Sequence, residues 1–367
     1  MSSSWGERIR LSIFGQSHSA AVGAVIEGLP AGFRVDMERL DSFMKRRAPG
    51  GPLATPRREG DRIEFLSGIA GGRLCGSPLC LIIRNADARP GDYSEFRDVP
   101  RPGHADYTSS VKYGGFQDAS GGGHFSGRLT APLTAAGGVC LQILEARGIF
   151  VGAHLKSVGG VEDRAFDPAS VSRADFNARF FSPLTVLDAA AGARMAAAIE
   201  AARAEGDSLG GVVECAAVGL PAGLGEPIFG GLESGIASLV FGIPAVKGVE
   251  FGSGFAAAAM RGSEHNDPFV CEDGAVITAT NHAGGILGGI STGMPLVFRA
   301  AFKPTPSIAR AQRTLSLRTM QLTELNIKGR HDPCVAVRAV PAVEAAAAVA
   351  LCDALLPGNY EPLKGAE

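Results

Sequence analysis

The stretches AAVGAVIEGLPAG (residues 20–32) and GGVVECAAVGLPAG (residues 210–223) decide the fold. Each is an apolar run that ends in the same pentapeptide, GLPAG, and each precedes a segment with apolar residues at helical spacing. Valine favours strands, and Gly and Pro mark turns, so each stretch predicts a strand, a turn and then a helix. The repeat indicates two similar halves, about residues 1–150 and 151–367, within one domain over residues 1–367.

Hydrophobic periodicity extends this pattern along the chain. Alternating apolar residues predict strands near residues 7–15, 61–69, 77–85 and 149–160. Apolar residues at helical spacing predict helices near residues 36–47, 131–147, 187–205, 232–242 and 342–356. Residues 85–128 form a long polar loop rich in glycine, and loops of that length in a compact domain are typically functional or disordered.

Composition and charge exclude several classes of protein. Of the 367 residues, 46% are hydrophobic and 20% are charged, which suits a packed core and not a disordered chain. The formal net charge is −2, so no global field favours nucleic acid or a membrane surface as a partner. The chain starts without an apolar signal segment, and no apolar run reaches membrane-spanning length. We therefore expect a cytoplasmic protein whose anion sites come from clustered Arg and Lys.

The seven cysteines are scattered and include no Cys-x-x-Cys pair. This spacing disfavours a zinc site and is typical of reduced thiols in a cytosolic protein. We expect no bound metal.

The stretch RPGHADYT (residues 101–108) is the first candidate for chemistry. Arg101 precedes a Pro-Gly turn, outside any helix, that carries His104 and Asp106. A histidine can move protons near neutral pH, although a polar surface loop has the same composition. Farther along, three glycines at residues 121–123 free the backbone to approach a flat or anionic ligand. Ser126 and Arg128 follow where a helix begins, and helix N-termini hold anions.

Ser17 and His18 stand just past the first long strand. Neighbouring side chains on a strand point apart, so a nucleophile–base pair is not expected from them. No Gly-x-Ser-x-Gly motif supports a hydrolase either. A histidine at a strand end that bonds to the backbone is the alternative interpretation.

The third cluster lies near the C-terminus. Lys303 is followed by Thr305 and Ser307, which are donors of the kind that hold phosphate. Arg330, His331 and Asp332 form a cation–imidazole–carboxylate triplet, although Asp332 alone could simply cap a turn. The three clusters predict an enzyme that handles a phosphorylated ligand by acid–base chemistry, because Arg forks match phosphate.

These clusters, in this order, resemble the chorismate synthase family over about residues 5–356. The strongest matches are RPGHADYT, GGILGGIS, KPT with SI shortly after, IPAVKGVEFG, and GRHDPC followed by AVPAVEA. The resemblance implies an α+β fold, an α/β sandwich in which two antiparallel sheets enclose helices with internal pseudo-two-fold β-α repeats. It also implies a homotetramer.

The activity that the resemblance implies is that of a carbon–oxygen lyase acting on phosphate in the shikimate pathway of aromatic amino acid biosynthesis. The substrate would be 5-enolpyruvylshikimate 3-phosphate, and an anti-1,4-elimination would give chorismate. The reaction needs reduced FMN as a transient electron donor. A separate flavin reductase and NADP would supply it, with no nucleic acid or membrane partner.

The resemblance also assigns roles to residues. His18 would be the acid near the leaving phosphate, His104 would protonate or hold the flavin, and Asp332 would be a base that works through flavin N5. The residues that bind substrate or other anions would be Arg47, Arg128, Arg330 and Ser17. The FMN site would comprise Ser126, Gly288, Lys303, Pro304, Thr305, Pro306, Ser307 and Arg330.

The sequence departs from the family pattern at several of these places. The family usually has Glu in place of Gln16, Gly in place of Ser19 and Glu in place of Leu129. It usually has Arg in place of His124 and Ser or Ala in place of Phe125, and a second Arg near the position of Leu53. Because the acid–base set persists, we expect an active enzyme. A catalytically impaired flavin- or anion-binding paralogue of the same fold is the alternative. A phosphate-ester hydrolase would need a metal site or nucleophile that the sequence does not offer.

Overall fold

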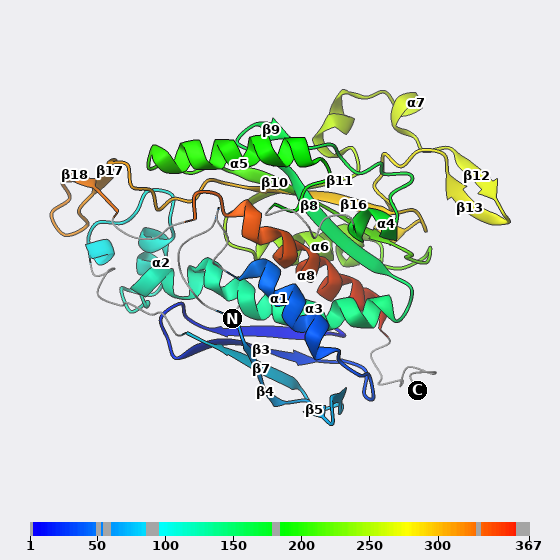
Figure 1. The fold of residues 1–367 in the computed structure, drawn as a ribbon, viewed down its shortest axis with the longest axis horizontal. Coiled ribbons are helices and arrows are strands. Elements are labelled where there is room, and N and C mark those ends of the chain that lie inside the picture. Colours follow the sequence, from blue (N-terminus) through cyan, green and yellow to red (C-terminus); the bar gives the residue numbers. More distant parts are fainter. Residues whose placement is uncertain are drawn as a thin grey trace.

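The structure is a computed structural model that describes residues 3–48, 53, 60–85, 95–177, 184–327 and 332–356. These residues form two five-stranded antiparallel sheets with helices between them (Figure 1). The expected α+β class is confirmed.

The first sheet comes from the N-terminal part of the chain and has the strand order β1-β2-β3-β7-β4. Its strands are β1 (Ser4–Trp5), β2 (Arg10–Gly15), β3 (Ala21–Glu27), β4 (Ile63–Ser67) and β7 (Leu79–Arg84). The short pair β5 (Ile69–Ala70) and β6 (Arg73–Leu74) extends beside it. Helix α1 (Met37–Arg47) follows β3, and the side chain of Asp36 caps it by accepting from the Arg39 amide, as the sequence predicts.

The second sheet has the strand order β11-β16-β10-β8-β9. Its strands are β8 (Phe150–Val158), β9 (Val161–Glu162), β10 (Gly211–Val218), β11 (Val246–Phe251) and β16 (Leu296–Phe302). Helices α4 (Arg173–Asn177), α5 (Ala189–Ala204) and α6 (Leu232–Phe241) lie around it, and α7 (Gly262–His265) is a short outer turn.

The two GLPAG copies adopt the same local conformation. Gly28 and Gly32 have φ angles of 86° and 84°, and Gly219 and Gly223 have φ angles of 81° and 93°. A Cβ at Gly28 would collide with the Arg8 carbonyl, and one at Gly219 would collide with the Gly148 carbonyl. Each copy therefore needs glycine where the turn leaves its sheet, which explains why the pentapeptide recurs.

Two long helices fill the space between the sheets. Helix α3 (Thr130–Glu145) packs against β3 and β7, and α8 (Ala336–Leu355) packs against β8 and β10. The two helices contact each other closely, since a Cβ on Gly137 would overlap Ala345. Helix α8 starts six residues before the predicted residue 342, because the helix continues through Pro341 with nearly every residue from Ala336 to Cys352 buried.

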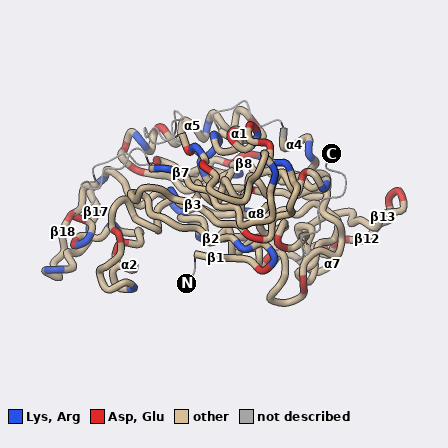
Figure 2. Tube along the Cα trace, turned by 90° about the horizontal axis from the view of Figure 1, so that it is seen from below, with Lys and Arg blue, Asp and Glu red and all other residues tan. Residues whose placement is uncertain are grey.

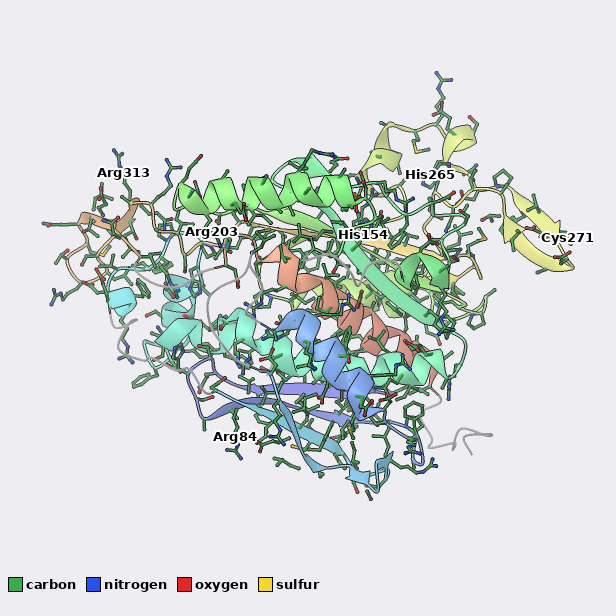
Figure 3. The ribbon with its side chains drawn as sticks, in the orientation of Figure 1. Arg84, His154, Arg203, His265, Cys271 and Arg313 are labelled. Carbon is green, nitrogen blue, oxygen red and sulfur yellow. The ribbon has the colours of Figure 1, made fainter. Side chains whose placement is uncertain are left out.

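Charged residues gather on the outer elements, whereas the trace around α8 is mostly uncharged (Figure 2). The remaining hairpins are β12 (Phe269–Glu272) with β13 (Ala275–Thr278), β14 (Ile286–Leu287) with β15 (Ile290–Ser291), and β17 (Gln312–Leu315) with β18 (Leu322–Leu325). Hairpin β12–β13 projects from the body and carries Cys271 (Figure 3). All seven cysteines are free thiols, as expected. Among the described helices, none has the length and apolarity needed to cross a membrane.

Candidate functional site

A cavity of about 750 Å³ brings distant segments together. Its walls come from the end of α1, residues 101–105, residues 121–130, residues 241–247, residues 303–307 and the start of α8. The six cationic side chains in the described wall are Arg47, Arg101, Arg128, Lys247, Lys303 and Arg338. The carboxylates of Asp61, Asp106 and Asp332 pair with four of them, which leaves a net charge of +3 among these described groups. An anion is the ligand that this cavity favours.

His104 is held by a buried ion pair. Its Nδ1 lies 2.6 Å from Asp106 Oδ1, and Arg101 donates to both oxygens of Asp106 at 2.7 Å. A carboxylate only accepts, so Nδ1 carries a hydrogen and Nε2 is the atom for proton exchange. Burial alone would raise the pKa of Asp106, but the hydrogen bonds from Arg101 and His104 lower it well below its usual range.

The sequence predicts that His104 and Asp106 both lie in a turn outside any helix, which is correct for His104 and wrong for Asp106. Helix α2 (Asp106–Lys112) starts at Asp106, and a short 3₁₀ helix, Gly127–Leu129, occupies the end of the expected loop. Before it, Gly121, Gly122 and Gly123 have non-helical φ angles of 61°, 88° and 53°. Residues 86–94 of that loop lie outside the described residues. His104 thus sits two residues before a helix, where Asp106 is fixed in the first turn.

Arg47 and Arg128 share one buried carboxylate. Arg47 donates to Asp61 Oδ2 from Nε at 2.8 Å and from Nη2 at 2.5 Å, and Arg128 Nη1 donates to Asp61 Oδ1. Burial lowers the pKa of Arg47 to about 10. Burial would raise the pKa of Asp61, but the two guanidinium groups lower it overall. The triad holds one net positive charge at the cavity wall.

Each of these arginines also donates to a further acceptor in the protein. Arg47 Nη1 donates to Thr130 Oγ1 at 3.1 Å, and Arg128 Nε donates to Asn85 Oδ1 at 2.9 Å. The side chains of Arg47 and Arg128 are 2% and 4% exposed. A ligand anion would therefore be attracted by a fixed charge, some of whose N–H groups already bond to the protein.

His18 and Ser17 lie beside the cavity and are not among the residues that line it. Ser17 Oγ donates to the Ser120 carbonyl at 2.8 Å and lies 3.0 Å from His18 Nδ1, so Nδ1 must donate to Ser17. The expectation that these side chains point apart is wrong, because residues 17 and 18 form a turn and not a strand. His18 packs on Gly121, which does line the cavity.

Asp332 lines the same cavity as His104. Arg338 Nη1 donates to Asp332 Oδ2 at 2.7 Å, and Arg338 Nε donates to the Arg47 carbonyl at 3.0 Å. Arg330, which the resemblance placed in both the substrate and the FMN sites, lies outside the described residues.

The predicted cofactor segment forms part of the wall. Lys303, Thr305, Pro306, Ser307 and Ser126 line the cavity. Lys303 Nζ donates to the Gly103 carbonyl, and burial, with Lys247 nearby, lowers the pKa of Lys303. Pro304 is not among the lining residues, and Gly288 is exposed at the turn of hairpin β14–β15, away from the lining.

The departures from the family pattern have visible roles. His124 Nδ1 donates to the Gly15 carbonyl at 2.8 Å, and its Nε2 lies 2.9 Å from Ser3 Oγ, so the ring ties the glycine loop to β2. Phe125 lines the cavity and is 38% exposed. Leu53 is packed in the hydrophobic core, where it offers nothing to an anion.

Sequence reasoning missed Asp61, Arg338 and the segment of residues 241–247. The last stretch overlaps IPAVKGVEFG, which carried the resemblance without a role for any residue. Asp61 had no local signal, because its partners Arg47 and Arg128 are distant in the chain. Arg338 was missed because the helix that carries it was predicted to start only at residue 342. Among the described residues, no cluster of His, Cys, Asp and Glu could hold a metal ion.

These features define an α+β protein with one large, cationic, histidine-bearing cavity. The family model for chorismate synthase matches residues 9–356. The chain is 50% identical to the chorismate synthase of Aeropyrum pernix over 96% of this chain and 92% of that protein, and 47% identical to that of Lancefieldella parvula over 97% and 96%. A crystal structure of chorismate synthase matches with a TM-score of 0.75 and 27% identity, covering 96% of this chain and 93% of that one.

The chain therefore belongs to the chorismate synthase family. This membership makes it a lyase of the shikimate pathway of aromatic biosynthesis.

Proposed function

We propose that the protein eliminates phosphate from 5-enolpyruvylshikimate 3-phosphate to give chorismate, with reduced FMN as cofactor. The C–O bond at C-3 and a C–H bond at C-6 break, a ring double bond forms, and phosphate and a proton are released in an anti-1,4-elimination. The observation that carries the proposal is the shared cavity of His104 and Asp332 with its net positive charge.

The lining residues fit a phosphorylated, flat cofactor. Thr305 Oγ1 is buried in this wall and is one of two such side-chain atoms, among the described residues, without a hydrogen-bond partner. An unsatisfied buried hydroxyl is costly, and a phosphate or ring oxygen would satisfy it. Gly103 and Gly121 line the same wall, and Ser126 adds a second hydroxyl. When bound, reduced FMN would supply the electron that the elimination borrows and regains.

The side chains of this protein would then hold and move protons. His18, fixed through Nδ1, would donate a proton from its other ring nitrogen, Nε2, to the leaving phosphate. Protonation makes phosphate a better leaving group. His104 would present Nε2 to the cofactor. Asp332 would accept the proton released from the substrate. Arg47 and Arg128 would stabilise the substrate's negative charge by electrostatic attraction.

The direct test is anaerobic turnover. Purified protein with chemically reduced FMN and 5-enolpyruvylshikimate 3-phosphate should form chorismate, detected by its absorbance after chromatography. No chorismate under strict anaerobiosis, from protein that is folded and binds FMN, rejects the proposal.

A second candidate function is a catalytically impaired binder of flavin or anions. The observation that favours it is that Arg47 and Arg128 already donate to Asp61, Thr130 and Asn85. This candidate predicts that FMN binds, by fluorescence quenching, while the same sample gives no chorismate.

Three further properties stay predictions. The chain would form a homotetramer, act in the cytoplasm and receive reduced FMN from a separate reductase that uses NADP. Light scattering tests the assembly. Turnover with oxidised FMN and NADPH, with and without an added flavin reductase, tests the source of electrons. If the protein has no reductase activity of its own, chorismate forms only when the reductase is added.

A further inference from the structure

We propose that Arg338 is the positioning residue of Asp332, and that it fixes this carboxylate relative to the Arg47–Asp61–Arg128 triad. The inference rests on the proposed function, because it takes Asp332 as the proton acceptor. Arg338 acts through Asp332 and is not assigned a contact with substrate.

The geometry leaves the guanidinium of Arg338 little freedom. Nη1 donates to Asp332 Oδ2 at 2.7 Å, while Nε donates to the Arg47 carbonyl at 3.0 Å. The group is planar, so two bonds from different nitrogens set both its position and its tilt. The side chains of Arg338 and Asp332 are 18% and 17% exposed, so the pair is largely shielded at the cavity wall.

The second bond matters because of where it ends. Arg47 is the last residue of α1, and the last carbonyls of a helix have no partner within that helix. Arg338, in the first turn of α8, supplies a donor to this carbonyl. One side chain therefore joins the proposed base Asp332 to the end of α1, at the main chain of Arg47, whose own side chain contacts Asp61.

Arg338 also places a positive charge next to the Asp332 carboxylate. The other titratable or charged groups near Asp332 among the described residues are Arg47 on α1, Arg128 after the glycine loop, His104 before α2, Lys247 on β11, Lys303 after β16 and the buried thiol of Cys334. Of these, the two bonds of Arg338 make it the group in direct contact with both Asp332 and α1.

The test compares Arg338→Gln and Arg338→Lys with wild type. Arg338→Gln should lower kcat about 10²-fold, the scale expected for a misplaced catalytic group, with KM for the substrate within about threefold. Arg338→Lys restores the charge without the fork and should recover about tenfold of the loss. Arg39→Gln on α1, which breaks an exposed pair with Glu145 at the end of α3, is the matched control and should keep wild-type kcat.

A double-mutant cycle separates the possible failures. If Arg338 acts through Asp332, adding Arg338→Gln to Asp332→Asn lowers kcat by less than about threefold further. Full additivity, or an Arg338→Gln enzyme with wild-type kcat, overturns the inference. If Asp332→Asn itself keeps wild-type turnover, the proposed role of Asp332 fails first. Should Arg338→Gln not fold, Arg338→Lys still decides the question, because wild-type kcat in a protein that lacks the guanidinium fork contradicts the proposal.

Discussion

His18 and His104 lie against consecutive residues of one loop. A Cβ on Gly121 would overlap the His18 ring, and a Cβ on Gly122 would come within 3.1 Å of the His104 ring. Ser17 reinforces this arrangement, because its amide donates to the Gly123 carbonyl at 3.1 Å. The glycine loop therefore sets the separation of the two imidazoles that the proposed function uses.

The first prediction tests that loop. Gly121→Ala should lower turnover at least about tenfold and reduce stability, because a methyl group displaces His18 and the residue has a φ of 61°. Gly71→Ala is the matched control, with a φ of 57° and nothing within 4 Å of the added Cβ. It should cost only the backbone strain of about 1–2 kcal/mol and leave kcat unchanged. Equal kcat for the two variants contradicts the prediction.

The second prediction concerns His104. His104→Ala should lower kcat by about 10²–10⁴-fold while the melting temperature changes little, because Arg101 and Asp106 still pair without the ring. His265→Ala, at a ring far from the cavity lining, serves as control (Figure 3). A large fall in melting temperature with proportionate loss of activity would mean that His104 is structural.

The third prediction concerns pH and Asp106. Asp106→Asn should destabilise the protein at pH 7 by about 3–5 kcal/mol, because buried Arg101 loses its counter-ion. The pKa of Asp106 is lowered in the folded state, so its stabilisation is present above the unfolded value of about 3.9 and is lost as the pH falls through the lower folded value. Urea unfolding at pH 7, 5, 4 and 3 should show the difference from wild type shrinking below about pH 4. A constant difference over this range refutes the assignment.

The fourth prediction concerns a buried cluster away from the cavity. His154, on β8, lies 3.1 Å from Asp163 and 3.0 Å from Glu214, and all three side chains are at most 3% exposed (Figure 3). Each ring nitrogen therefore lies within hydrogen-bond distance of a buried carboxylate, and the imidazole joins the two acidic side chains. His154→Leu should cost about 3–5 kcal/mol, measured by urea unfolding.

The control for that variant is Arg84→Leu, which breaks the exposed pair with Glu64. It should cost less than about 1 kcal/mol. Folded His154→Leu protein should keep wild-type kcat, since His154 does not line the cavity. A loss as small as that of Arg84→Leu would show that the cluster does not depend on the imidazole.

Local pattern was enough to predict most of the elements. Helix α1 begins one residue after its predicted cap Asp36, and α3 lies within two residues of the predicted range 131–147. These elements are set by side chains close in sequence. Helix α8 was predicted too short, because Pro341 usually ends a helix and only the burial of both its flanks overrides that tendency.

The candidate site was predictable only in part. His104, Arg128, Lys303 and Asp332 lie in motifs, and they line one cavity. Asp61 carries no motif, since its importance comes from partners 14 and 67 residues away. Long-range pairing of this kind leaves no periodic trace in one sequence.

The carboxylate shared by Arg47 and Arg128 restricts how this chain can diverge. Loss of Asp61 alone leaves two buried like charges without a counter-ion. Loss of one arginine alone leaves Asp61 with only one of its two cationic partners. The three positions should therefore be inherited as a block, so that descendants keep all of them or replace all of them together.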